Sequence, residues 1–318
     1  MAGSGHSHTI HSVGSEHAAF VWDNAAASVL EVESGATVQL ECADASGGQL
    51  SAQSTASDVA GLDLSRVNPV TGPVYVKGAQ PGDVLAVEIL ELTPEDWGWT
   101  AIIPGFGLLA DEFPDPWLHI SQVDPVAKRV RFTDGVTLAF EPFPGTIGLA
   151  PEEPGQHSVV PPSKWGGNMD IKHLRPGTIL YLPVAVPGAL FSVGDTHAAM
   201  GDGEVCGTAV EAAMDIAVRL TVRKDMSARY PQFAIPTGRL AATEQSAYHV
   251  CTGIGPDLME ATREAVRALI DHIQHRYGRS REEAYAIASV AGDLRIHEIV
   301  DVPNWVVGAF LPDTIFTA

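Results

Sequence analysis

The stretch VYVKGAQPGDVLAVEI, residues Val74 to Ile89, decides the fold of this chain. A short apolar strand leads into a turn that ends in Pro81-Gly82, and a longer strand with alternating apolar residues follows. Proline before glycine is typical of a type II turn, because proline fixes φ at the first central position and glycine accepts the positive φ of the second. The pattern therefore predicts a β-hairpin.

The same strand–turn–strand pattern occurs twice more in the chain. Val29 to Cys42 reads VLEVESGATVQLEC, and Met169 to Val184 reads MDIKHLRPGTILYLPV. Gly35 and Gly177 stand where Gly82 stands in the first stretch. Hairpins of independent origin also look alike, but three related copies favour a sandwich or barrel built from repeated hairpins.

The C-terminal third has a different pattern. Strand patterns dominate up to about residue 225, and Met214 to Val222 alternates apolar and polar residues with the period of a strand. Pro256 to Tyr277 instead has apolar residues at helical spacing, and Gly278 is suited to end that helix. Ser280 and Glu283 form the pattern of a capping box for a second helix.

These patterns predict a mainly β fold with a helical insertion near the C-terminus, α+β overall. We expect residues 1–16 to be a flexible leader, since they are polar and rich in Gly, Ser and His. Residues 17–318 would then form a single catalytic unit, β-rich over 17–225 and helix-containing over 226–318.

Composition narrows the classes of partner and compartment. The 318 residues have a formal net charge of -20, which disfavours binding to nucleic acids and to anionic membrane surfaces. No apolar run approaches the roughly 20 residues that span a bilayer, and no apolar signal peptide is present. The three cysteines form no CxxC pair, which fits a reducing compartment. We therefore expect a cytoplasmic protein.

The stretch FSVGDTHAAMGDGEVC, residues Phe191 to Cys206, has the densest set of potential ligands. If it begins as a strand, Asp195 and His197 share one face. A turn at residues 201–203 would then bring Glu204 back beside His197. Oxygen and nitrogen ligands together suit Zn²⁺, which lowers the pKa of bound water to about 7. The alternative is a polar turn whose aspartates bond their own backbone.

The stretch WGGNMD, beginning at Trp165, is the second candidate. Gly166 and Gly167 would let the backbone approach a ligand closely. Asn168 could hold an amide or an oxyanion, and Asp170 could be a metal ligand or a general base. A glycine turn with Asn in the left-handed region is the alternative interpretation.

Other chemistries have weaker support. DASGGQ, beginning at Asp44, is short, and a hairpin turn explains it better than a binding loop. Cys206 lacks the flanking residues of a nitrilase nucleophile, and the chain has no GxSxG elbow, GxGxxG after a strand or Walker A loop.

Together these stretches resemble the acetamidase/formamidase family. The matching segments are DASGGQ at Asp44, NPVTGPVYVKGAQPGDVL at Asn68, GTIGLAPEEPG at Gly145, GGNMDIKHL at Gly166, LYLPVAVPGALFSVGDTHAAMGDGEV at Leu180 and GDLRIHEIV at Gly292. They occur in the family's order and cover roughly residues 20 to 315. The GGNMD and GDTHAAMGDGE segments are long and unusual, so a chance match is improbable.

The resemblance implies a cytoplasmic, oligomeric amidohydrolase that releases ammonia from short amides such as formamide or acetamide. It also implies a mainly β fold and a divalent metal near the Asp195-x-His197 segment. The family includes lactam-opening enzymes, so the resemblance does not fix the substrate. One position departs from the family pattern, because Trp165 stands where a His precedes the paired glycines.

These observations combine into one hypothesis, metal-assisted hydrolysis of the C–N bond of small amides to carboxylate and ammonia. The expected metal ligands are Asp195, His197 and Glu204, with Zn²⁺ as the expected ion and Ca²⁺ as the alternative. The expected catalytic residues are Asp170, Glu204 and Asn168, and the expected substrate-binding residues are Gly166, Gly167, Trp165 and Asp44. The competing hypotheses are a lactam-opening hydrolase and a catalytically weak family member that binds a small molecule or a metal. We expect a homo-oligomer.

Overall fold

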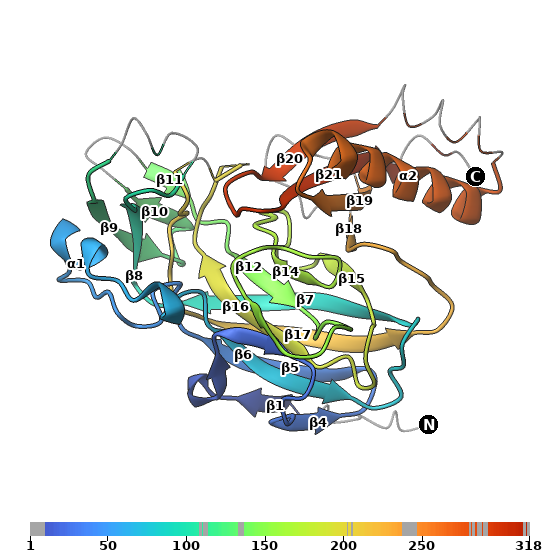
Figure 1. Ribbon diagram of the computed structural model, residues 1–318, viewed down its shortest axis with the longest axis horizontal. Helices are drawn as coiled ribbons and strands as arrows, with labels where there is room; N and C mark the ends of the chain where they lie inside the picture. Colours follow the sequence, from blue (N-terminus) through green and yellow to red (C-terminus); the bar gives the residue numbers. More distant parts are fainter. Residues whose placement is uncertain are drawn as a thin grey trace.

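Two large β-sheets pack against each other and one long helix covers one end of the larger sheet (Figure 1). The computed structural model describes residues 10–107, 110, 114–132, 137–201, 203–204, 206–236, 247–279, 281, 284, 288, 292–313 and 316. Strands dominate these residues, which confirms the predicted mainly β class with a helix near the C-terminus. The sheets are open, so the sandwich alternative holds and the barrel does not.

The larger sheet has nine strands and includes segments from both ends of the chain. In spatial order these are β1 (Ile10–Val13), β5 (Ala36–Cys42), β17 (Met214–Arg223), β7 (Val84–Pro94), β15 (Ile179–Pro183), β18 (Gln232–Ile235), β19 (Tyr248–Gly255), β21 (Trp305–Pro312) and β20 (Asp293–Glu298). β17 lies antiparallel to both β5 and β7, and its alternating pattern matches the strand predicted from Met214 to Val222. The first nine residues of the predicted leader lie outside the described residues, whereas β1 pairs with β5.

The smaller sheets provide most of the elements around the interior site. The six-stranded sheet contains β14 (Gly166–Asn168), β12 (Phe143–Gly148), β16 (Phe191–His197), β6 (Val70–Val76), β2 (Ala18–Ala19) and β4 (Leu30–Val32). A four-stranded sheet contains β11 (Thr137–Ala139), β10 (Arg129–Arg131), β9 (Trp117–Asp124) and β8 (Trp97–Ile102), and β13 (Gln156–Ser158) pairs with β3 (Val21–Asp23). Three short helical segments are η1 (Ser15–His17), α1 (Ala56–Ala60) and η2 (Leu64–Arg66).

The repeated strand–turn–strand units connect the two large sheets and are not hairpins. β4 and β6 pair with each other in one sheet, whereas the strands that follow them, β5 and β7, both flank β17 in the other. The turn glycines Gly35, Gly82 and Gly177 have nearly identical φ angles of 93°, 94° and 95°. Each also donates its N–H to a carbonyl of a neighbouring strand. The prediction of repeats with glycine turns is therefore confirmed, but their strands pair between repeats.

Apolar residues from both sheets form the main core. Val38 and Leu40 of β5 and Val87 of β7 are fully buried, and they share one cluster with Val74 of β6 and Phe191 of β16. Burying a side chain of this size stabilises the fold by roughly 1.5–3 kcal/mol. Because strand side chains alternate between faces, the period-2 apolar pattern directs these residues into the space between the sheets.

Helix α2 (Leu258–Tyr277) packs on β19 and β21. Asp257 caps its first turn by accepting the N–H of Glu260, and Gly278 ends it in the left-handed region with φ 64°. These bounds confirm the predicted helix and its terminal glycine. The predicted capping box of Ser280 and Glu283 lies outside the described residues.

Two stacked histidines between α2 and β19 predict acid sensitivity of the fold. The rings of His249 and His272 lie parallel with centroids 3.4 Å apart. Burial lowers the pKa of His249 well below its ordinary value, and burial lowers the pKa of His272 to about 4. Unfolding releases both from this environment, so the unfolded chain binds protons below about pH 6.5 that the folded chain does not.

We therefore expect the free energy of unfolding to fall as pH drops from about 6.5 towards 4. Protonation of His272 in the unfolded chain lowers the free energy of unfolding at pH 5 by about 2 kcal/mol. Urea denaturation of wild type and His272→Phe at pH 7.5 and pH 5 measures it, and the variant should lose less stability over that interval. Equal losses in the two proteins would contradict the assignment.

Across the described part of the chain, no helix has both the length and the apolar character that crossing a membrane requires.

Candidate active site

Seven ionisable side chains from distant parts of the sequence meet in the interior. We call them the acidic cluster: Asp170, Asp195, His197, Glu204, Glu211, Glu298 and Asp301. None is more than 7% exposed. One imidazole therefore lies among six buried carboxyl groups, an arrangement that is unfavourable unless the carboxyls are protonated or held by cations.

Local strand and turn structure positions these side chains. Asp195 and His197 come from the end of β16, as the strand pattern predicted. Glu211 exchanges backbone hydrogen bonds with Trp99, and its backbone also pairs with that of His197. Glu204 follows Gly203, whose N–H donates to the carbonyl of His297 in β20. The cluster is thus fixed by pairings between segments and not by one motif.

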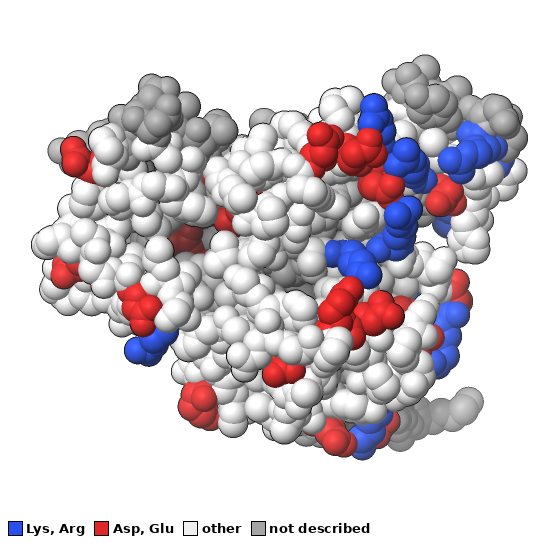
Figure 2. All heavy atoms as spheres, viewed as in Figure 1, with Lys and Arg blue, Asp and Glu red and all other residues white. Residues whose placement is uncertain are grey.

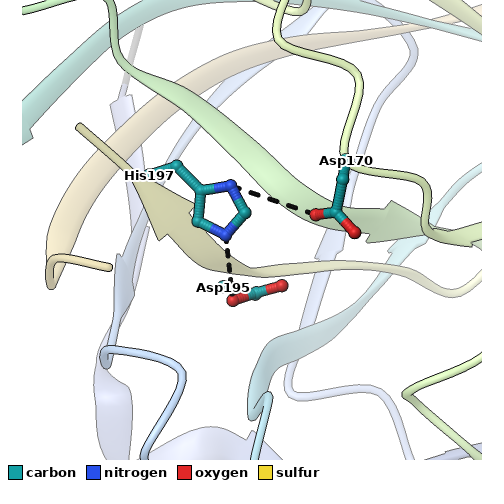
Figure 3. A group of neighbouring side chains, drawn as sticks. All are labelled: Asp170, Asp195 and His197. Atoms are coloured by element: carbon teal, nitrogen blue, oxygen red, sulfur yellow. Dashed lines mark hydrogen bonds and ion pairs between the residues drawn. The ribbon is translucent and has the colours of Figure 1, made fainter. Parts of the chain in front are cut away.

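His197 lies at the centre of the carboxyl groups (Figure 3). Its Nε2 is 3.0 Å from Glu211 Oε2, 3.3 Å from Asp195 Oδ1 and 4.0 Å from Glu204 Oε1. Its Nδ1 lies 3.9 Å from Asp170 Oδ1 on the opposite side of the ring. The imidazole therefore has a carboxyl group facing each nitrogen.

Strained backbone conformations concentrate at this site. Seven described residues other than glycine have positive φ, and four of them are Asn68 (49°), Asp170 (47°), Asp195 (52°) and Glu204 (44°). The left-handed region is uncommon for any residue with a Cβ and is rare for glutamate. Such strain persists only where surrounding structure imposes it, and it marks functional sites. The left-handed backbone directs the carboxyl groups of Asp170, Asp195 and Glu204 into the interior.

Burial and charge shift the ionisation of the cluster. Burial raises the pKa of Asp170 well above its ordinary value, with His197 opposing this effect and Asp195 reinforcing it. Burial also raises the pKa of Glu211 to about 7 against the attraction of His197. Burial alone would lower the pKa of His197, but attraction to Glu211 and Asp195 raises it well above its ordinary value. The carboxyl groups lack enough positive charge around them to be ionised together.

Three subsets of the cluster could hold a metal ion. The ligand atoms of Asp170, Asp195 and His197 all lie within 4.8 Å of one another, as do those of His197, Glu204 and Glu211 and those of Asp170, Glu204 and Asp301. No N–H or hydroxyl group of the described residues donates to either oxygen of Asp170, and Nδ1 of His197 makes no hydrogen bond among them. The Asp170 carboxyl group has the carboxyl group of Asp301 as its neighbour. Carboxylate and imidazole are suitable ligands for a divalent cation, so the donors fit this role.

Gly145 of β12 keeps the space between these donors open. A Cβ added at this glycine would lie 2.5 Å from Asp170 Oδ1, 2.7 Å from His197 Cε1 and 2.9 Å from Asp195 Oδ2. Any other residue would therefore place its side chain between the carboxyl groups and the imidazole. The absence of a side chain leaves a space lined by three potential ligands.

A polar network holds the side chains beside the cluster. Thr146 Oγ1 lies 2.7 Å from Asn168 Oδ1 and 3.1 Å from Asp195 Oδ2. The Thr146 hydroxyl can donate its proton to either oxygen. The Asn168 amide donates to Asp301, and the Asn68 amide donates to Asp195 at 3.1 Å. These bonds fix the orientation of Asp195 and leave one N–H of Asn168 for another partner.

A cavity of about 280 Å³ opens onto the cluster. Asn168, Asp195, Glu204, Glu211 and Asp301 line one part of it, whereas most of the other lining residues are apolar. Figure 2 shows red carboxylate atoms recessed in a hollow left of centre on this face. The acidic cluster is therefore reachable by a small molecule.

The structure brings together five of the residues that the sequence analysis selected. Asp170, Asp195, His197 and Glu204 belong to the acidic cluster, and Asn168 lies beside it. Their roles as ligands and catalytic residues stay predictions.

The other four selected residues lie elsewhere. Trp165, Gly166 and Gly167 line a separate cavity of about 600 Å³, and Lys164 lies over the Trp165 ring. Gly166 and Gly167 lie in β14, which pairs with β12, and neither these glycines nor Trp165 line the cavity that opens onto the cluster. Asp44 is buried and accepts the indole N–H of Trp99, so it supports a wall of the 280 Å³ cavity.

Three members of the cluster were not predicted from the sequence. Glu211 and Asp301 each stand between two apolar residues outside the named strands, and Glu298 ends β20. The one available signal was that HEIVD places two acids within an apolar segment, in a stretch that resembles the family.

Comparison with known proteins identifies the family of this chain. The model of the acetamidase/formamidase family matches residues 13–158 and 153–318. A formamidase from Methylophilus methylotrophus is 29% identical, covering 90% of this chain and 86% of the relative, and an acetamidase from Mycolicibacterium smegmatis is 27% identical over 80% and 81%. The crystal structure of an acetamidase from Bacillus halodurans superposes with a TM-score of 0.87 at 31% identity, covering 96% of this chain and 98% of the other. The chain described here belongs to the acetamidase/formamidase family.

Proposed function

We propose that this protein is an amidase that hydrolyses the C–N bond of small amides to a carboxylate and ammonia, with a divalent cation in the acidic cluster. The observation that carries the proposal is the buried acidic cluster beside a cavity, in which four carboxyl groups lie within 4.0 Å of the His197 ring nitrogens. Membership of a family whose relatives include a formamidase and an acetamidase supports the same reaction.

Asp170, Asp195 and His197 are the proposed ligands. Their donor atoms are mutually close, the oxygens of Asp170 have no hydrogen-bond donor within the described residues, and Gly145 leaves room beside all three. A divalent cation held there would polarise an amide carbonyl and lower the pKa of water to about 7. We propose Zn²⁺ because imidazole and carboxylate form the ligand set, with Ca²⁺ as the alternative.

The proton-transferring residue is Glu204. It lines the cavity, whereas Asp170 does not, so Glu204 is the better placed of the two predicted bases. Its carboxyl group takes a proton from the attacking water and delivers a proton to the departing nitrogen, which leaves as ammonia. Its inward direction is imposed by the positive φ of its backbone.

Asn168 orients the substrate. Its carbonyl oxygen lies 2.7 Å from the Thr146 hydroxyl and one N–H is bonded to Asp301, so the side chain is held in place. The second N–H is available to the carbonyl oxygen of the amide as negative charge develops there.

The protein would work as a cytoplasmic homo-oligomer, in keeping with the sequence resemblance.

Metal removal tests this proposal. Purified protein is treated with a chelator and reloaded with Zn²⁺ or Ca²⁺, and ammonia release is measured over short amides, aryl amides and lactams. We expect activity to fall at least about 100-fold and to return with one ion. Reloading should also raise the unfolding temperature, because an ion at 1,000 times its Kd adds about 4 kcal/mol.

Full activity in protein shown to be metal-free would contradict the metal mechanism. The catalytically weak alternative predicts that no amide of the panel is hydrolysed, although a ligand still raises the unfolding temperature. Turnover of lactams alone would identify a lactam-opening hydrolase.

A further inference from the structure

We infer that the cavity selects amides with a medium-sized apolar acyl group, such as hexanamide or benzamide, over formamide and acetamide. The inference deepens the proposed function and rests on it. It concerns the walls of the cavity and not the acidic cluster.

The cavity is much larger than the shortest amides. Its volume of about 280 Å³ is close to the roughly 300 Å³ at which pockets for drug-sized molecules begin. Formamide has three heavy atoms and acetamide has four, so either would leave most of this space to water. A substrate with several additional carbon atoms would fill the cavity.

Polar and apolar groups occupy different parts of the lining. Carboxyl groups and the Asn168 amide come from the cluster, where the amide bond must lie. The apolar side chains that line the remainder are Leu62, Leu64, Val67, Trp99, Ile103 and Phe106. An acyl group that lies against them removes apolar surface from water, which formamide cannot do.

The Trp99 wall is rigid. Its indole N–H donates to Asp44 at 2.9 Å, and its backbone exchanges two 2.8 Å hydrogen bonds with Glu211. Trp99 is 2% exposed and cannot turn into the cavity without breaking the indole bond. The space beside Glu211 therefore stays open, and a substrate can occupy it.

The mouth of the cavity has an apolar surface that nothing in the described chain covers. Leu64 is 63% exposed although it lines the cavity. Phe106 packs over Gly207, where an added Cβ would lie 2.4 Å from the ring. Exposed leucine beside a half-buried phenylalanine at an opening is typical of a site that binds apolar groups.

The expected increase in kcat/KM can be stated for each methylene added to the acyl group. Burying one methylene corresponds to about fourfold in kcat/KM, or about 0.8 kcal/mol. We expect kcat/KM to rise by about this factor for each added methylene, which is about 16-fold from acetamide to butyramide and about 16-fold again from butyramide to hexanamide. The rise should end when the cavity is full.

The test measures kcat/KM by ammonia release and Kd by calorimetry for formamide, acetamide, butyramide, hexanamide and benzamide. Val67→Phe fills part of the cavity that Val67 lines and should lower the hexanamide-to-acetamide ratio of kcat/KM at least tenfold. Leu64→Ser should lower it about fourfold. Val126→Ser is the matched control, since Val126 is 94% exposed and lies outside the cavity lining, and its ratio should stay within twofold of wild type.

The outcomes separate the two claims. Hydrolysis that is fastest for formamide or acetamide, with a ratio unchanged by Val67→Phe in folded protein, overturns the inference and leaves the proposed function standing. If no amide is hydrolysed but hexanamide binds more tightly than acetamide, the proposed function fails and the selectivity of the cavity stands. If hexanamide neither reacts nor binds better, the inference is overturned.

Discussion

Gly145→Ala should lower amide hydrolysis by about 1,000-fold or more while leaving the protein folded. The backbone φ of Gly145 is accessible to alanine, so the substitution does not strain the main chain. Its Cβ would instead lie 2.5 Å from Asp170 Oδ1 and 2.9 Å from Asp195 Oδ2, inside the space proposed for the cation. Steady-state ammonia release measures the activity, and thermal unfolding reports on the fold.

Gly255→Ala is the matched control for this substitution. A Cβ at Gly255 would meet no atom within 4 Å, so its activity should stay within twofold of wild type. Metal content should fall in Gly145→Ala only. A Gly145→Ala protein that retains more than a tenth of wild-type activity would contradict the placement of the cation.

His197→Gln should have an effect of similar size on activity and a larger effect on the fold. His197 is the one imidazole among six carboxyl groups, with Glu211 3.0 Å and Asp195 3.3 Å from its Nε2. Removing one partner of a buried charged network destabilises a protein by roughly 3–5 kcal/mol. Glutamine can reach part of the same space but cannot carry a positive charge.

His275→Gln provides the comparison, since His275 is exposed on α2. We expect this control to match wild type in metal content, ammonia release and urea denaturation. In contrast, His197→Gln should bind metal at least tenfold more weakly and release ammonia about 1,000-fold more slowly. Metal affinity equal to that of wild type would remove His197 from the ligand set.

Local pattern was sufficient for much of the fold because the turns depend on single residues. Gly35, Gly82 and Gly177 adopt positive φ, and α2 begins at an Asp257 cap and ends at Gly278, all of which short stretches specify. Strand pairing was not predictable in this way. Whether β4 pairs with β5 or with β6 depends on packing between the sheets, which no single repeat encodes.

In the site, too, residues close together in the sequence could be predicted, whereas those joined by distant strand pairings could not. Asp195 and His197 were predicted together because they lie two positions apart on one strand, with Thr196 between them, and Glu204 because a turn precedes it. Glu211 is positioned by backbone pairing with Trp99 of β8 and with His197, and Asp301 accepts from the Asn168 amide. These contacts join segments far apart in the sequence. The paired glycines were misplaced because β14 turns them towards a different cavity.

Anomalous diffraction at the zinc absorption edge, on crystals of Zn²⁺-loaded protein that releases ammonia from an amide, would locate the cation. We expect a peak in contact with the side chains of Asp170, Asp195 and His197, beside Gly145. Active crystals with no peak in the acidic cluster, or with a peak on a different set of residues, would contradict this placement.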